Sequence, residues 1–157
     1  MDSKFHSCAT LEIHEALLID HKILSDGLLR AAAELGRIGE MAGRVAQVCL
    51  PHFAEEEKGV FRAIRLLNDS DSDRVRSDME PATQMIAQLS AQHLAIRGHR
   101  QAINATIEAL LHEASKQENK AICDLVHFLR DHEYMENQLM YPALQFAGEA
   151  VRRRLGH

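Results

Sequence analysis

Apolar residues recur every three or four positions along most of the 157-residue chain, a spacing that is typical of amphipathic α-helices. No stretch alternates between apolar and polar residues as a half-buried β-strand would. Gly36 is a natural stop for the first helix. The pattern therefore predicts an all-α protein, with helices over residues 10–35, 45–67, 74 or 81 to 112, and 115–141.

The polar run over residues 68–73 is the clearest break in the chain, because it is rich in turn-forming side chains. It divides one predicted domain into two helical hairpins, 10–67 and 74–146. Pro142 is expected to kink the last helix or to open a short C-terminal helix. Long amphipathic helices with short connections pack most readily as an up-down-up-down four-helix bundle, in which metal sites are built from facing helices.

One segment of the chain occurs twice. His52 and Glu56 lie four residues apart, and so do His132 and Glu136; similar apolar and aromatic residues follow each pair at matching offsets. On an α-helix this spacing turns two side chains only about 40° apart and separates them by about 6 Å along the axis. The members of each pair can therefore reach one site.

Both pairs lie within apolar stripes, so both are expected to point into a core. The predicted inward-facing neighbours are Val45, Val48, Cys49 and Ala63 around the first pair, and Leu125, Phe128, Leu129, Leu139 and Ala143 around the second. An ionised carboxylate buried without a partner is very costly. A bound metal ion would remove that cost. Imidazole with carboxylate suits iron, manganese or zinc better than calcium or magnesium.

Two further histidines align in the remaining predicted helices. His21 and His93 each follow a leucine by four positions and precede an aliphatic residue by three. Each half of the chain thus offers one histidine from its first helix and a histidine–glutamate pair from its second. A single pair of this kind also occurs as a surface ion pair, but the duplicated set favours a metal-binding core.

This pattern resembles the hemerythrin-like HHE cation-binding family, whose motif is H, HxxxE, H, HxxxE. The resemblance extends from about His14 to Leu144. It implies a non-haem centre of two iron ions, with Glu56 and Glu136 as bridging carboxylates. The ligands that it implies are His21, His52, Glu56, His93, His132 and Glu136.

The chain departs from the oxygen-carrying members of that family at two positions. Arg97 and Asn137 stand where the carriers have a histidine and an aspartate ligand. The resemblance is therefore closer to the bacterial branch, and it implies binding or sensing of oxygen, nitric oxide or peroxide. Two alternatives remain: a di-iron enzyme or repair factor that removes peroxide or donates iron to iron–sulfur centres, and a metal-free or zinc-bound helical interaction module. The sequence leaves open whether there is turnover.

Several nearby side chains have two interpretations. His14 lies two turns before His21 on the same face, as a seventh ligand or as a core histidine above the site. Cys49 is better interpreted as a buried inert thiol than as a redox-sensitive one. Arg97 faces inward and could pair with a carboxylate or reach the surface. Carboxylates that could orient the ligand histidines are Asp20, Glu55 and Asp131.

The composition of the chain limits the classes of partner and the cellular compartment that we expect. The net charge of −5 argues against nucleic acid, which requires a basic surface. No apolar run approaches the roughly 20 residues that span a bilayer, and the N-terminus does not have the pattern of a signal peptide. Three cysteines without a CxxC motif fit a reducing compartment, so we expect a cytoplasmic protein. A sensor of this size would act with a protein partner or as a homo-oligomer.

Overall fold

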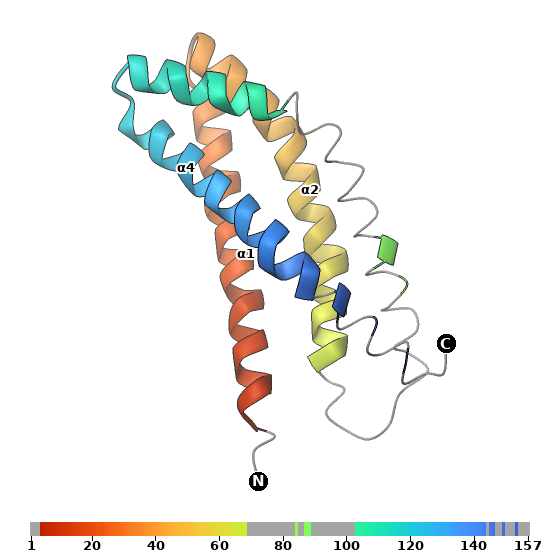
Figure 1. Ribbon diagram of the computed structural model, residues 1–157. Helices are drawn as coiled ribbons and strands as arrows, with labels where there is room; N and C mark the ends of the chain where they lie inside the picture. The colour runs from red at the N-terminus through yellow and green to blue at the C-terminus, as the bar shows by residue number, and fades with distance from the viewer. Residues whose placement is uncertain are drawn as a thin grey trace.

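The computed structural model describes residues 4–68 and 103–143 and a few single positions, 84, 87, 88, 145, 146, 149 and 153. The side chains of residues 4–14 and 60–68 are not among those described. The described residues are helical apart from short turns, and none of them lies in a β-strand (Figure 1). The all-α prediction is confirmed for this part of the chain. Most of the predicted third helix falls outside the described residues, but positions 103–116 are helical.

The first two helices, α1 (Lys4–Ala32) and α2 (Arg37–Asn68), form a hairpin and pack along each other. α1 ends at Ala32, three residues before the predicted end at residue 35. Gly36 lies in the turn that follows, with a φ of 82°, a left-handed conformation that glycine adopts without strain. Both helices begin earlier than predicted. No residue between 4 and 10 breaks a helix, and α1 extends to the N-terminal side of its predicted start at residue 10.

The next turn lies farther along than predicted. The helical segment 103–116 continues past residue 112, and α4 (Lys120–Met135) begins five residues after the predicted Ser115. Glu118 adopts a left-handed φ of 54°, and the side chain of Asn119 accepts a hydrogen bond from the backbone N–H of Ile122 at 3.3 Å. A polar cap directly before the first helical residue satisfies a backbone donor that the helix itself leaves unpaired.

A π-helical turn, η1 (Glu136–Met140), follows α4 without a break. The backbone N–H of Tyr141 donates to the carbonyl of Glu136, five residues back, and residues 141–143 continue as helix. Pro142 therefore does not open a separate helix within residues 141–143, and the expected kink stays a prediction. A proline has no N–H to donate to the carbonyl four residues before it, and the wider turn directly precedes it.

The π turn also changes which side chains face the core. Leu139, predicted to face inward, is 57% exposed, and Ala143 is exposed as well. Met140 and Tyr141 are buried instead. The extra residue in the turn rotates the following positions away from the regular α-helical register. Val48 is also exposed, because it lies at the edge of the apolar stripe of α2.

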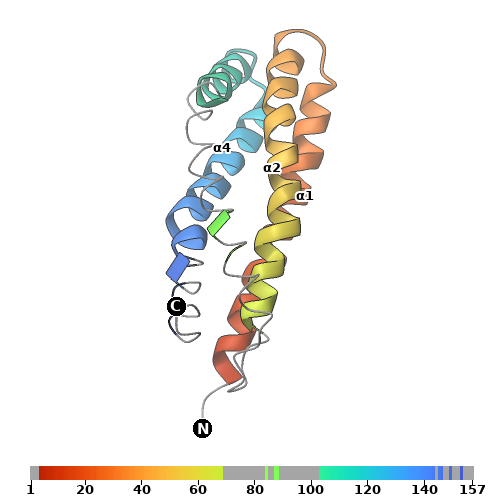
Figure 2. The same ribbon diagram turned by 90° about the vertical axis from the view of Figure 1, so that its right-hand side faces the viewer.

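Aliphatic side chains from all four helical segments fill the core. Gly27 of α1 lies so close to α4 that an added Cβ would lie 2.5 Å from Leu125 Cδ1. Figure 2 shows α1 and α2 alongside each other with α4 against them. None of the described helices is long and apolar enough to cross a bilayer. Residues almost completely buried in this core are Leu24, Leu28, Ile38, Val45, Leu110, Val126 and Leu129.

Candidate metal centre

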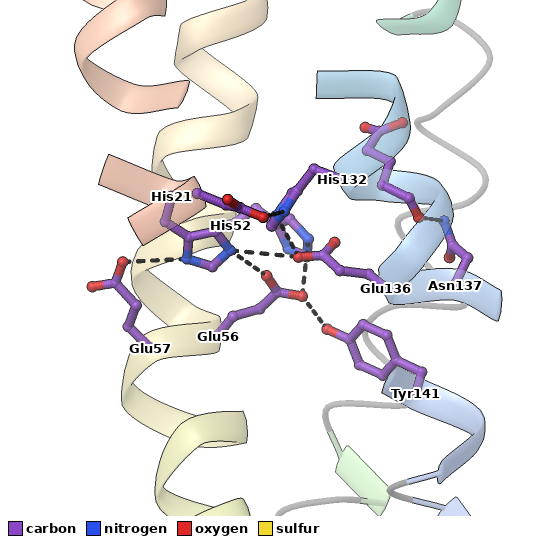
Figure 3. Close-up of polar contacts among 10 residues, drawn as sticks. His21, His52, Glu56, Glu57, His132, Glu136, Asn137 and Tyr141 are labelled. Carbon is purple, nitrogen blue, oxygen red and sulfur yellow. Dashed lines mark hydrogen bonds and ion pairs between the residues drawn. The ribbon is translucent and has the colours of Figure 1, made fainter. Parts of the chain in front are cut away.

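Five of the six predicted ligands lie together, on three helices and the π turn (Figure 3). His21 comes from α1, His52 and Glu56 from α2, His132 from α4, and Glu136 from the first position of η1. His21, Glu56, His132 and Glu136 are each at most 2% exposed, and they are the buried charged or polar residues in the described part of the chain. His52 is partly exposed.

The imidazole nitrogens and carboxylate oxygens of these residues lie within a few ångströms of one another. His132 Nε2 is 2.7 Å from Glu136 Oε1. His21 Nε2 is 3.4 Å from both Glu136 Oε1 and Glu56 Oε2. His52 Nε2 is 3.3 Å from Glu56 Oε1, so the i, i+4 spacing brings both pairs together as expected.

The cluster divides into two groups that could each hold a cation. One contains His21, His132 and Glu136, the other contains His52, Glu56 and Glu136, and the ligand atoms within each group lie within 4.8 Å of one another. Glu136 belongs to both groups. A carboxylate shared in this way can bridge two ions. The bridging role of Glu56 stays a prediction.

Several donor atoms of the cluster lack hydrogen bonds. Among the described residues, Glu56 Oε2 and Glu136 Oε2 are buried without a hydrogen-bonding partner. The ring nitrogens of His132 are also buried, and the atoms nearest to them are carboxylate oxygens, Glu136 Oε1 at 2.7 Å and Asp20 Oδ2 at 3.6 Å. Buried polar groups without a hydrogen bond are rare in folded proteins because each loses its hydration without compensation. Nitrogen and carboxylate oxygen donors with unused lone pairs, turned toward one another, fit a transition-metal ion.

Carboxylates also lie at the outer nitrogens of two of the histidines. Glu57 Oε1 is 3.2 Å from His21 Nδ1, and Asp20 Oδ2 is 3.6 Å from His132 Nδ1, which is too long for a direct hydrogen bond. A carboxylate at this position fixes the orientation and tautomer of a ligand histidine. Asp20 was a predicted candidate. Glu55 and Asp131, the other two, are exposed and have no described contact with the histidines.

Two aromatic residues complete the site, and the sequence reasoning gave neither of them a role. Phe53 stacks on the ring of His21 at 4.4 Å between centroids, and it meets His132 edge-on at 5.7 Å. Tyr141 donates a hydrogen bond from its hydroxyl to Glu56 Oε1. The position of Phe53 directly after His52 was the available signal for the first, and the matching offset of Phe61 and Tyr141 in the two repeats was the signal for the second.

The glutamates of the cluster raise the pKa values of the histidines beside them. Burial alone would lower the pKa of His21, but its contacts with Glu136 and Glu56 outweigh burial and raise that pKa to about 9. Burial alone would lower the pKa of His132 as well, but its contact with Glu136 outweighs burial, so this pKa is also raised. At neutral pH a proton on His21 therefore neutralises part of the carboxylate charge, and a bound metal ion would replace that proton.

The two glutamates have opposite shifts. Burial would raise the pKa of Glu136, but contacts with His132 and His21 outweigh it and hold that pKa well below the usual range. Burial raises the pKa of Glu56, and the charge of Glu136 adds to the rise, while contacts with His21 and Tyr141 oppose it. Glu136 is thus the firmly ionised carboxylate of the pair.

The structure does not describe the side chains of three of the remaining sequence candidates. His93 and Arg97 fall outside the described residues, and so does the side chain of His14, whose backbone lies in α1. Cys49 is buried in the core. The side-chain amide of Asn137 donates to the carbonyl of Glu133 at 2.6 Å, within its own helix.

Comparison with protein-family models, curated proteins and solved structures found no match for this chain. Its function is therefore inferred from the repeated motif and from the arrangement of these side chains.

Proposed function

We propose that this protein is a hemerythrin-like, up-down-up-down four-helix bundle that holds a non-haem di-iron centre. In this proposal it binds or senses oxygen or a related small molecule such as nitric oxide or peroxide. The observation that carries the proposal is the burial of two glutamates, Glu56 and Glu136, among three histidines from three different helices. His93, from the remaining predicted helix, would be the sixth ligand.

The balance of charge supports a metal ion at this position. Two buried carboxylates repel each other and lose their hydration, and a protonated His21 supplies only one positive charge. Two divalent ions would neutralise both carboxylates and use the donor atoms that have no hydrogen bond. The mixed nitrogen and oxygen donors accept iron, manganese or zinc, and the resemblance to hemerythrin-like proteins favours iron.

The surrounding residues would prepare the site for a small ligand. Glu57 would hold the ring of His21 in place, and Phe53 packs against the rings of His21 and His132. His52 is partly exposed, so the group on α2 lies on the accessible side. A pair of iron ions would supply open coordination positions for a small molecule.

A metal-free helical module is the second candidate. It is favoured by the position of His21 Nε2, 3.4 Å from an oxygen of each glutamate, because a protonated histidine there can stabilise the carboxylates when no ion is bound. In that case the cluster would be a buried ionic network that contributes specificity of packing.

The substitution Glu136→Gln separates the two candidates. It keeps the shape of the side chain but removes the charge shared by both groups. We expect anaerobically loaded Glu136→Gln to retain less than half of the iron of the unmodified protein and to lose its nitric oxide-dependent absorption. Glu133→Gln, three residues earlier on α4, is the matched control and should bind as the unmodified protein does. Equal and negligible iron in all three proteins would favour the metal-free module, and peroxide turnover by the loaded protein would favour the enzyme.

A further inference from the structure

Tyr141 is one of the residues beside the cluster that are not among the six predicted ligands. Its side chain is buried, and its hydroxyl donates a hydrogen bond to Glu56 Oε1 across from the end of η1 to α2 (Figure 3). The two residues are 85 positions apart in the sequence, so the contact depends on the packing of the helices. A buried phenol must find a partner for its hydroxyl, and here that partner is a candidate ligand.

The π turn is what brings Tyr141 to this position. In a regular α-helix a residue five positions after Glu136 would point about 140° away from it. In η1 the N–H of Tyr141 bonds to the carbonyl of Glu136, so the turn is wider than in an α-helix and Tyr141 lies closer to the face of Glu136 than regular α-helical geometry would place it. Leu139 is correspondingly turned out to solvent. Turns of this type are frequent at functional sites.

We propose that Tyr141 is a positioning residue of the metal centre, aimed by the π turn to hold Glu56 in its ligating orientation. This inference rests on the proposed function. Tyr141 contacts Glu56, which belongs to the group that contains His52, and the group of His21 and His132 would respond to Tyr141 only indirectly, through the contact of Glu56 Oε2 with His21.

The two oxygens of Glu56 have different contacts. Oε1 accepts the hydrogen bond from Tyr141 and lies near His52 Nε2, while Oε2 faces His21 Nε2 at 3.4 Å and has no hydrogen bond among the described residues. A carboxylate fixed through one oxygen cannot rotate freely about its terminal torsion, so the other oxygen keeps its direction. Supporting hydrogen bonds of this kind typically change metal affinity by about 10–100-fold.

Tyr141→Phe removes the hydroxyl and keeps the ring, and Tyr134→Phe is the matched control because Tyr134 is 64% exposed on α4. The probe is Co²⁺ alone, added to the metal-free full-length protein and followed by calorimetry and by visible absorption. We expect Tyr141→Phe to weaken one of the two binding constants by about 10–100-fold and to leave the other within about threefold. The visible spectrum of the weakened site should change, whereas Tyr134→Phe should match the unmodified protein in both readouts.

A double-mutant cycle with Glu56→Ala tests whether Tyr141 acts through Glu56. In the Glu56→Ala background, Tyr141→Phe should have no further effect on Co²⁺ affinity or spectrum. Equal losses in both backgrounds, or equal weakening of both ions with a lower thermal midpoint of the metal-free protein, would overturn the inference in favour of a merely structural role.

Two other results would also overturn it and leave the proposed function standing. One is unchanged Co²⁺ binding in Tyr141→Phe while the unmodified protein binds two ions. The other is a visible phenolate-to-iron charge-transfer band in the ferric protein that disappears in Tyr141→Phe, because that band would make Tyr141 a direct ligand. Failure of the unmodified protein to bind any ion would refute the proposed function and this inference together.

Discussion

Glu136 holds the centre of the cluster, since it contacts His21 and His132 and belongs to both candidate groups. Its lowered pKa means that it carries a full negative charge at any pH at which the protein is expected to work. The histidines beside it determine whether that charge is balanced by a proton or by a metal ion. Single substitutions at these positions therefore test the site most directly.

We expect His132→Ala and His52→Ala each to reduce bound metal sharply, at least about tenfold at limiting metal, because each removes one nitrogen ligand. His127→Ala, at an exposed position of α4, is the control and should load normally. Metal content is measured by elemental analysis of proteins whose helical circular dichroism is unchanged. Loading near that of the unmodified protein in both His132→Ala and His52→Ala would contradict the six-ligand hypothesis.

Metal affinity should rise with pH, because His21 must lose its proton before its nitrogen can bind an ion. With a pKa of about 9 in the metal-free protein, this competition persists well above neutrality. Zn²⁺ titrations at pH 6, 7 and 8 in a non-coordinating buffer would measure it. An apparent affinity that is constant over this range would contradict the protonated state assigned to His21.

The stability of the metal-free protein should change in the opposite direction. The pKa of His21 is raised from 6.5 to about 9, so its contribution is fully present below pH 6.5 and is lost as the pH rises through 9. The raised pKa values of His132 and Glu56 act with the same sign. Urea unfolding in the presence of a chelator should therefore show a lower free energy of unfolding at pH 9 than at pH 6.5. His21→Gln should reduce that difference.

At the scale of the elements, the backbone in the turn between α1 and α2 leaves no room for a side chain at Gly39. A Cβ added at Gly39 would lie 1.8 Å from the backbone oxygen of Glu34, whereas one added at Gly43 would meet only Ala32 Cβ at 3.9 Å. We expect Gly39→Ala to lower the free energy of unfolding by about 1–3 kcal/mol. Gly43→Ala should raise it by about 0.5–1 kcal/mol through helix propensity. Urea denaturation measures both, and equal effects would contradict the described geometry of the turn.

The helices were predictable because periodicity and turn residues are local signals. Gly36 lies in the turn after α1, close to the predicted end of that helix, and the spacing of His132 and Glu136 placed them on one face. The π turn was not predictable in this way, because a local change from i→i+4 to i→i+5 hydrogen bonds leaves no mark in the apolar pattern. As a result, Leu139 was assigned to the wrong face.

The contacts between helices were harder still to predict. Glu57 lies beside His21 only because of the way α2 packs against α1, and Tyr141 reaches Glu56 only through the π turn. Sequence spacing reports which residues share a face of one helix, whereas it does not report the rotation of one helix relative to another. Intrahelical pairs were therefore accessible to the sequence, and the outer partners of the ligands were not.

At the scale of the whole molecule, the cluster joins three elements that are distant in sequence, α1, α2 and α4 with its π turn. An ion held by all of them should bind the folded chain and not the unfolded one, so it should stabilise the fold. We expect the thermal midpoint to rise on addition of Fe²⁺ or Zn²⁺ and to fall again with a chelator. With metal at about 100 times its dissociation constant, the gain should be about 2.7 kcal/mol. A midpoint that does not respond to metal would contradict this coupling.

The number of metal ions per chain tests the central claim most directly. The purified, untagged protein is loaded with iron under anaerobic conditions, freed of unbound metal, and analysed for metal identity and stoichiometry. The two groups of ligands that share Glu136 predict about two irons per chain. No bound iron, or a single zinc in its place, would contradict the di-iron centre.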